Sequence, residues 1–216
     1  MINENMLSYA RNAGGMPYFS QAGQDLFVLE MLAGKREGLY CEIGGAHPYD
    51  SNNSALLESK YQWAGFSVEL NPELVTQFNS YRRNPCIEAD ATVLDYERIL
   101  IEREFSKQVD YLSLDIDPAR VTYSALNRIP FDRYRFSVIT YEHDAYSCGD
   151  EYMRLSREFL NAKGYQLVVA NVMSFGRDFE DWWVDPTVVE RSVWERFQMQ
   201  GVEFSEILPL FKTGLV

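Results

Sequence analysis

Short runs of apolar, β-branched and aromatic residues alternate along the chain with segments of helical spacing. The runs are about six residues long, which is typical of strands. In the segments between them, apolar residues recur three or four positions apart. This alternation predicts βαβ units and a mostly parallel sheet. The predicted strands cover residues 38–43, 65–70, 86–91, 109–116, 136–141, 165–172 and 178–184.

The segments between the runs are predicted to be helices. They cover residues 54–61, 72–83, 95–105, 121–127, 150–162 and 187–200. Because the seventh strand begins only a few residues after the sixth, it is expected to pair with it as an antiparallel hairpin. The fold class is therefore α/β, with a seven-stranded sheet, an antiparallel last strand and helices on both faces.

No internal repeat or linker-like tract interrupts the chain, so we expect one domain. Residues 1–35 are interpreted as a helical N-terminal extension that packs on the core. Residues 36–186 form the Rossmann-like domain, and residues 187–216 are its C-terminal helix and tail.

Composition narrows the classes of partner. Of the 216 residues, 46% are hydrophobic, which is enough for a sizeable core, and the formal net charge is -12. A nucleic-acid-binding protein needs a basic surface, and an anionic membrane would repel this chain. We therefore expect neither nucleic acid nor membrane as a partner, and a neutral or cationic small molecule instead.

The three cysteines, Cys41, Cys86 and Cys148, are widely spaced and form no CxxC pair, so neither a zinc site nor a disulfide framework is expected. The N-terminus lacks the basic start and apolar core of a signal peptide, and no apolar stretch reaches the roughly 18 residues of a membrane span. We expect a cytoplasmic protein.

Two glycines, Gly44 and Gly45, follow the first strand directly, between Glu42 and Ala46. Ligands of open α/β sheets bind outside the carboxyl ends of the strands, and glycines let the backbone approach a ligand closely. A pyrophosphate loop would read GxGxxG and lead straight into a helix, which this segment does not. A carboxylate at Glu42 suits an ammonium or sulfonium group instead, although an ordinary strand-end turn is an equally weighted interpretation.

Further acids end the next three strands. Glu69 lies 25 residues after Gly44, close to the spacing of about 20 residues at which an acid accepts ribose hydroxyls. Asp90 either accepts an adenine amine or caps a turn before Thr92. Asp115 and Asp117 are two positions apart, so their side chains are expected on the same side of the strand. Two neighbouring carboxylates could face a cation or include a general base, or they could form only a turn.

His143 ends the fifth strand and is one of only two histidines in the chain. A neutral imidazole there could take a proton from a hydroxyl, or join Asp115 and Asp117 as ligands of a divalent metal such as Mg²⁺. A structural histidine is the alternative.

These motifs together resemble the FkbM family of S-adenosylmethionine-dependent methyltransferases. The resemblance covers roughly residues 19–186 and is carried by GLYCEIGGAHPYDSNNSALLE, WAGFSVELNPE, CIEADAT, VDYLSLDID and VITYEHDAY. It implies a class I methyltransferase fold with S-adenosylmethionine as cofactor. The residues that the resemblance assigns to the cofactor or to the entrance beside it are Glu42, Gly44, Gly45, Ala46, Glu69, Leu70, Asp90, Ala91, Asp115, Gln21, Gln24 and Asp25.

The resemblance also implies O-methylation of a hydroxyl on a sugar or other natural product. In that mechanism His143 is the preferred base, with Asp115 or Asp117 orienting it or holding the metal. Two alternatives stay open, a non-catalytic Rossmann-like binding module and an NAD-dependent oxidoreductase. The aromatic residues, including Trp182 and Trp183, suit either ring stacking or core packing, and tryptophans near the C-terminus offer a weak basis for a homodimer patch.

Overall fold

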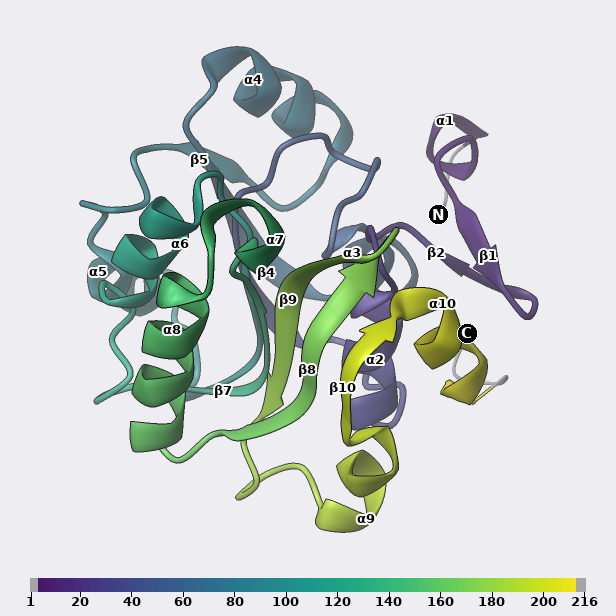
Figure 1. The fold of residues 1–216 in the computed structure, drawn as a ribbon. Helices are drawn as coiled ribbons and strands as arrows, with labels where there is room; N and C mark the ends of the chain where they lie inside the picture. Colours follow the sequence, from purple (N-terminus) through teal and green to yellow (C-terminus); the bar gives the residue numbers. More distant parts are fainter. Residues whose placement is uncertain (1–3, 213–216) are drawn as a thin grey trace.

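The computed structural model describes residues 4–212 and is organised around an eight-stranded sheet in the order β10-β8-β9-β7-β6-β3-β4-β5 (Figure 1). Its strands are β3 (Leu39–Ile43), β4 (Ala64–Glu69), β5 (Cys86–Glu88), β6 (Gln108–Leu114), β7 (Arg135–Glu142), β8 (Gln166–Ser174), β9 (Arg177–Val184) and β10 (Met199–Glu203). Strands β3 to β7 pair in parallel, whereas β9 runs antiparallel between β7 and β8. The predicted fold class is confirmed.

The sheet has one strand more than the predicted seven. Strand β10 pairs in parallel with β8, with Met199 opposite Val169. The predicted helix over residues 187–200 was therefore wrong in its second half. That region holds only α9 (Arg191–Trp194) and a 3₁₀ turn (Glu195–Phe197) before the chain enters the sheet.

Helices cover both faces of the sheet, each over its own apolar core (Figure 1). On one face α5 (Tyr96–Glu102), α6 (Ala119–Leu126) and α8 (Glu151–Ala162) contribute Leu100, Leu126 and Leu160 to the core. On the other face lie α2 (Gln24–Met31), α3 (Ala55–Tyr61), α9 and α10 (Phe204–Ile207). The remaining elements of the main body are α4 (Pro72–Tyr81), α7 (Ala145–Cys148) and a 3₁₀ turn (Leu208–Leu210).

The N-terminal segment contains strands as well as helices. Helix α1 (Glu4–Leu7) precedes a two-stranded hairpin of β1 (Arg11–Ala13) and β2 (Met16–Tyr18), which turns at Gly14 and Gly15. Every residue of α2 is buried, so this segment is packed against the domain. Residues 1–3 and 213–216, the ends of the predicted N- and C-terminal segments, lie outside the described residues.

The tryptophans near the C-terminus belong to the core. Trp182 and Trp183 are fully buried, and Trp194 is 7% exposed. They provide no surface patch, so the sequence basis for a homodimer patch was wrong. The same burial explains the aromatic residues at these positions as core packing.

Among residues 4–212, no helix is long and apolar enough to cross a membrane.

Candidate functional site

The turn after β3 requires glycine at its first position. Gly44 has a φ of +97°, and a Cβ there would lie 1.7 Å from the carbonyl oxygen of Asp115 at the end of β6. The amide groups of Gly44 and Gly45 both donate to the carbonyl of Val68 in β4. Glycine therefore allows three adjacent strand ends to meet without a side chain between them.

This turn forms the floor of a cleft of about 860 Å³ at the carboxyl ends of the parallel strands. Its lining residues come from three strand ends, the loop before α3, the start of α4 and the short segment before α2. They are Gln21, Gly44, Gly45, Ala46, Asp50, Ser51, Asn53, Glu69, Leu70, Asn71, Pro72, Glu73, Asp115, Ile116 and Asp117. A smaller recess of about 60 Å³ adjoins the cleft and shares Gly44, Glu69, Leu70 and Ile116 with it.

Glu69 lies where the cleft meets the recess and is held by the backbone. Its Oε2 accepts a hydrogen bond from the amide of Ala46 at 3.1 Å, and its Oε1 accepts one from the amide of Asn71 at 2.8 Å. Each oxygen keeps a second lone pair for a ligand. The two bonds fix the carboxylate in one orientation, as recognition of a diol requires.

Asp90 and Ala91 line the recess together with Val121 and Leu70. Oδ1 of Asp90 accepts hydrogen bonds from the side chain and the amide of Thr92, and these bonds lower the pKa of Asp90. The turn interpretation of Asp90 is therefore confirmed. Because Asp90 also borders the recess, its contact with an adenine amine stays a prediction.

Glu42 lies beneath the cleft and is not among its lining residues, so its position does not support the predicted contact with the cofactor. The side chain is 1% exposed, and its oxygens accept from Ser67 Oγ at 2.5 Å, from the amide and hydroxyl of Ser54, and from Asn52 Nδ2. Burial raises the pKa of Glu42. The residue joins β3 to β4 and to the start of α3, so it supports the glycine turn from below.

Three residues of the N-terminal segment were expected near the cofactor, and two of them, Gln24 and Asp25, are buried away from the cleft. Gln24 is buried, where it donates to Glu180 Oε2 at 2.9 Å and accepts from the amide of Ala22. Asp25 is fully buried and accepts from the amide of Phe19 and the hydroxyl of Ser20. The buried position of Gln24 therefore gives no support to its predicted binding of the cofactor, whereas Gln21 does line the cleft.

His143 is fully buried and lines neither the cleft nor the recess. Its Nδ1 accepts from the amide of Ala145 at 3.2 Å, which places the ring proton on Nε2. Nε2 lies 3.5 Å from Oδ1 of Asp181, an ion-pair distance rather than a well-formed hydrogen bond. The predicted roles of His143 as general base and metal ligand gain no support from this position, because its ring is packed inside the fold.

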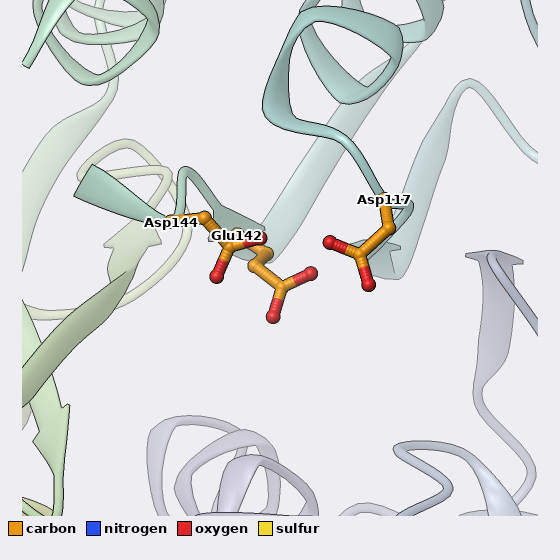
Figure 2. Close-up of side chains that lie close together, drawn as sticks. All are labelled: Asp117, Glu142 and Asp144. Carbon is orange, nitrogen blue, oxygen red and sulfur yellow. The ribbon is translucent and has the colours of Figure 1, made fainter. Parts of the chain in front are cut away.

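The carboxylates of Glu142 and Asp144, the neighbours of His143 in sequence, do line a cavity. Oxygen atoms of Asp117, Glu142 and Asp144 lie within 4.8 Å of one another, and the three side chains converge from the ends of β6 and β7 (Figure 2). Burial, followed by the hydrogen bond and charge of Asp117, raises the pKa of Asp144 to about 7. Burial, followed by the charge of Asp115, raises the pKa of Glu142 well above its usual range.

A second cavity of about 500 Å³ lies on the other side of this acid cluster. Gln21 borders both it and the cleft, while Glu142 and Asp144 form part of its wall. Its other lining residues are Arg11, Tyr146, Ser174, Phe175, Arg177, Phe179 and Phe204. Ser174, Phe175 and Arg177 come from the tip of the β8–β9 hairpin, where the amide groups of Phe175 and Gly176 donate to the carboxylate of Glu203.

Glu142 and Asp144 could have been identified from sequence as further acids at the end of the fifth predicted strand. Glu142 ends β7, whereas Asp144 follows the strand with a φ of +47°, so the rule of strand alternation does not by itself place Asp144. The sequence argument applied the same rule to Asp115 and Asp117, both of which line the cleft. Asn53 was also missed, since no local pattern marks it, although it lines the cleft with its Oδ1 buried and unpaired among the described residues.

Comparison with known proteins supports the fold. No protein-family model and no curated protein matches this chain, so membership of the FkbM family stays a prediction. Among solved structures, a protein described as an rRNA methylase from Clostridium thermocellum is 12% identical, with 78% of this chain and 97% of that chain covered and a TM-score of 0.52. One described as an O-methyltransferase from Klebsiella pneumoniae is 14% identical, with coverages of 76% and 80% and a TM-score of 0.50. At these identities the likeness shows that the chain has the Rossmann-like fold of class I methyltransferases.

Proposed function

We propose that this protein is an S-adenosylmethionine-dependent methyltransferase that transfers the methyl group to a hydroxyl oxygen of a small molecule. The observation that carries the proposal is Glu69, fixed by two backbone amides at the junction of a polar cleft and a small apolar recess. This arrangement suits a ribose whose base enters the recess and whose amino-acid end extends along the cleft.

Each part of the cleft suits one part of that cofactor. Glu69 would accept the ribose hydroxyls, and Asp90 with Ala91 and Leu70 would border the adenine. The backbone of Gly44 to Ala46 allows close approach, and Asp115 offers a negative charge to the ammonium and sulfonium groups. When bound, S-adenosylmethionine supplies a methyl group that its sulfonium already activates. The chain's residues then have to align the acceptor oxygen with that methyl group.

The same geometry argues against a dinucleotide cofactor. After Gly44 the chain runs through a loop to α3, which begins only at Ala55, so no helix N-terminus faces a pyrophosphate at the glycine turn. Asp115 and Asp117 also line the cleft and would repel phosphate. An NAD-dependent oxidoreductase is therefore the weaker candidate.

The acceptor would occupy the second cavity. Its wall combines Tyr146, Phe175, Phe179 and Phe204 with the acid cluster, a mixture suited to a ring that carries hydroxyl groups. Among the structural neighbours, one is described as an O-methyltransferase and another as an rRNA methylase. The net charge of -12 and the acids between the two cavities favour a small molecule over RNA.

Calorimetric titration with S-adenosylhomocysteine tests the cofactor assignment. We expect saturable binding by the wild type, at least tenfold weaker binding by Glu69→Gln, and no comparable response to NAD⁺. Glu88→Gln is the matched control, because Glu88 makes the same charge change on the neighbouring strand at an exposed position outside the cleft. Binding of NAD⁺ in preference, or equal binding of S-adenosylhomocysteine by both variants, would contradict the proposal.

A panel of hydroxylated sugars, polyketides and a short RNA, assayed with labelled S-adenosylmethionine, tests the acceptor. Methylation of the RNA alone would overturn the small-molecule assignment. Cofactor binding with no transfer to any acceptor would favour the non-catalytic binding module.

A further inference from the structure

The acid cluster between the two cavities carries negative charge that the described chain does not neutralise. Asp117 lies three residues after the end of β6 and is exposed, Glu142 ends β7, and Asp144 lies two residues further along the chain. No ion pair formed by the described residues includes any of these three or Asp115. Arg177, which also lines the second cavity, lies over the ring of Tyr146 at 5.5 Å. Carboxylates this close repel one another unless a proton or a cation lies between them.

Two buried carboxylates, one in the cluster and one beside it, lack a donor group or a cation that would balance their charge. Asp144 is 6% exposed, and its carboxylate points toward Asp117 and Glu142 in Figure 2, so its hydrogen-bonding partner is the acid Asp117 and not an N–H group or a cation of the described residues. Glu180 is 1% exposed and lies beside Glu142 across the β7–β9 pairing. Its Oε2 is bonded to Gln24 and Trp182, but its Oε1 has no partner among the described residues. Buried carboxylate oxygens without partners are rare because they lose solvation without compensation.

We propose that Asp117, Glu142 and Asp144 bind one divalent cation, Mg²⁺ or Mn²⁺. All three donors are carboxylate oxygens, which these hard cations prefer over nitrogen and sulfur. Three protein ligands leave coordination positions for water or for oxygens of a substrate. His143 is not a ligand, because its ring is buried and contacts Asp181.

The position of the cluster gives the cation a role, and this step rests on the proposed function. Glu142 and Asp144 line the acceptor cavity, whereas Asp117 lines the cofactor cleft. A cation held by the three lies at the boundary between the cavities, where it would offset the repulsion between the acids and a deprotonated hydroxyl. Two open positions suit an acceptor with two neighbouring oxygens, such as a vicinal diol or an α-hydroxy acid.

The site is tested without cofactor or acceptor by titrating the protein with Mn²⁺ alone. Binding is measured as the loss of the free Mn²⁺ signal in electron paramagnetic resonance. We expect one bound Mn²⁺ per chain that Mg²⁺ displaces. Glu142→Gln and Asp144→Asn should each weaken binding at least tenfold, the equivalent of about 1.4 kcal/mol. Glu158→Gln, which removes one exposed charge from α8 outside both cavities, should bind as the wild type does.

Thermal melts show whether each variant is folded, and removing one charge from a repelling cluster should keep or raise the melting temperature of the metal-free protein. Absence of Mn²⁺ binding by the wild type, or equal affinity of the wild type and Asp144→Asn, would overturn the proposal. The S-adenosylhomocysteine titration separates the two hypotheses. A protein that binds S-adenosylhomocysteine but not Mn²⁺ lacks the metal site, and one that binds Mn²⁺ but not S-adenosylhomocysteine contradicts only the proposed function.

Once the metal site is established, acceptors that differ only in the spacing of two hydroxyls test the chelation step. Mn²⁺-dependent turnover of a vicinal diol but not of its 1,3-isomer is expected. Equal turnover of both isomers would show that the acceptor does not chelate the cation.

Discussion

Replacing Gly44 with alanine tests the glycine turn on which both strand geometry and cofactor binding depend. A left-handed φ at a non-glycine residue costs about 1–3 kcal/mol. The new Cβ would lie 1.7 Å from the carbonyl oxygen of Asp115, so β3 and β6 must separate at this end, and such overpacking adds about 1–3 kcal/mol. The amide of Asp115 donates to the carbonyl of Ile43 at 2.9 Å, and that bond is the first that separation would strain.

We therefore expect Gly44→Ala to lower the free energy of unfolding by at least about 2 kcal/mol. In a domain of this size that lowers the melting temperature by at least about 4 °C. Gly164→Ala is the matched control, since Gly164 has a φ of +81° but no atom within 4 Å of an added Cβ. It carries the backbone strain without the overlap. Differential scanning calorimetry gives both values, and equal losses in the two variants would refute the role of the close approach. Titration with S-adenosylhomocysteine should also show weaker binding by Gly44→Ala alone.

Two further predictions concern the buried residues beneath the site. His143→Ala should lower the melting temperature by several degrees, because the substitution leaves a cavity. The affinity for S-adenosylhomocysteine should stay within about threefold of the wild type. Loss of turnover with an unchanged melting temperature would instead support a role of His143 as the general base. Burial pushes the pKa of Asp181 upward, but the hydrogen bonds and charges of Arg157 and His143 together outweigh burial and lower the pKa. A carboxyl group whose pKa is lower in the folded than in the unfolded protein stabilises the fold at pH values above its unfolded-state pKa of about 4. That stabilisation is lost as the pH falls through the folded-state pKa. Asp181→Asn should therefore destabilise the protein more at pH 7 than at pH 3, and an equal loss at both would contradict the assignment.

The parallel core of the fold was predictable because its strands are buried on both faces. The segment 109–116 is almost continuously apolar, and it appears as β6 with all but its first residue buried. Strand β10 gave no such signal. It is an edge strand with Gly201 in its middle and no fully buried residue, so it is defined by pairing with β8 rather than by its own pattern.

The site was predictable to the level of strand ends but not of side-chain exposure. Glu69, Asp90 and Asp115 line the recess or the cleft as their positions predicted. Glu42 holds an equivalent position at the end of β3, yet it is buried because Ser54 and Ser67 supply hydroxyls from other elements. The chain alone does not reveal those partners, since the three residues meet only when β3, β4 and α3 pack together.

The position of the β8–β9 hairpin lets the acceptor cavity vary in sequence during evolution independently of the cofactor cleft. Its tip supplies Phe175, 93% exposed, and Arg177 to the acceptor cavity, but it contributes nothing to the cleft around Glu69. Substitutions or insertions at this surface tip can therefore alter acceptor selectivity while the cofactor half stays intact. Related chains are expected to diverge most in this hairpin, and libraries for engineering new acceptor specificity should begin there.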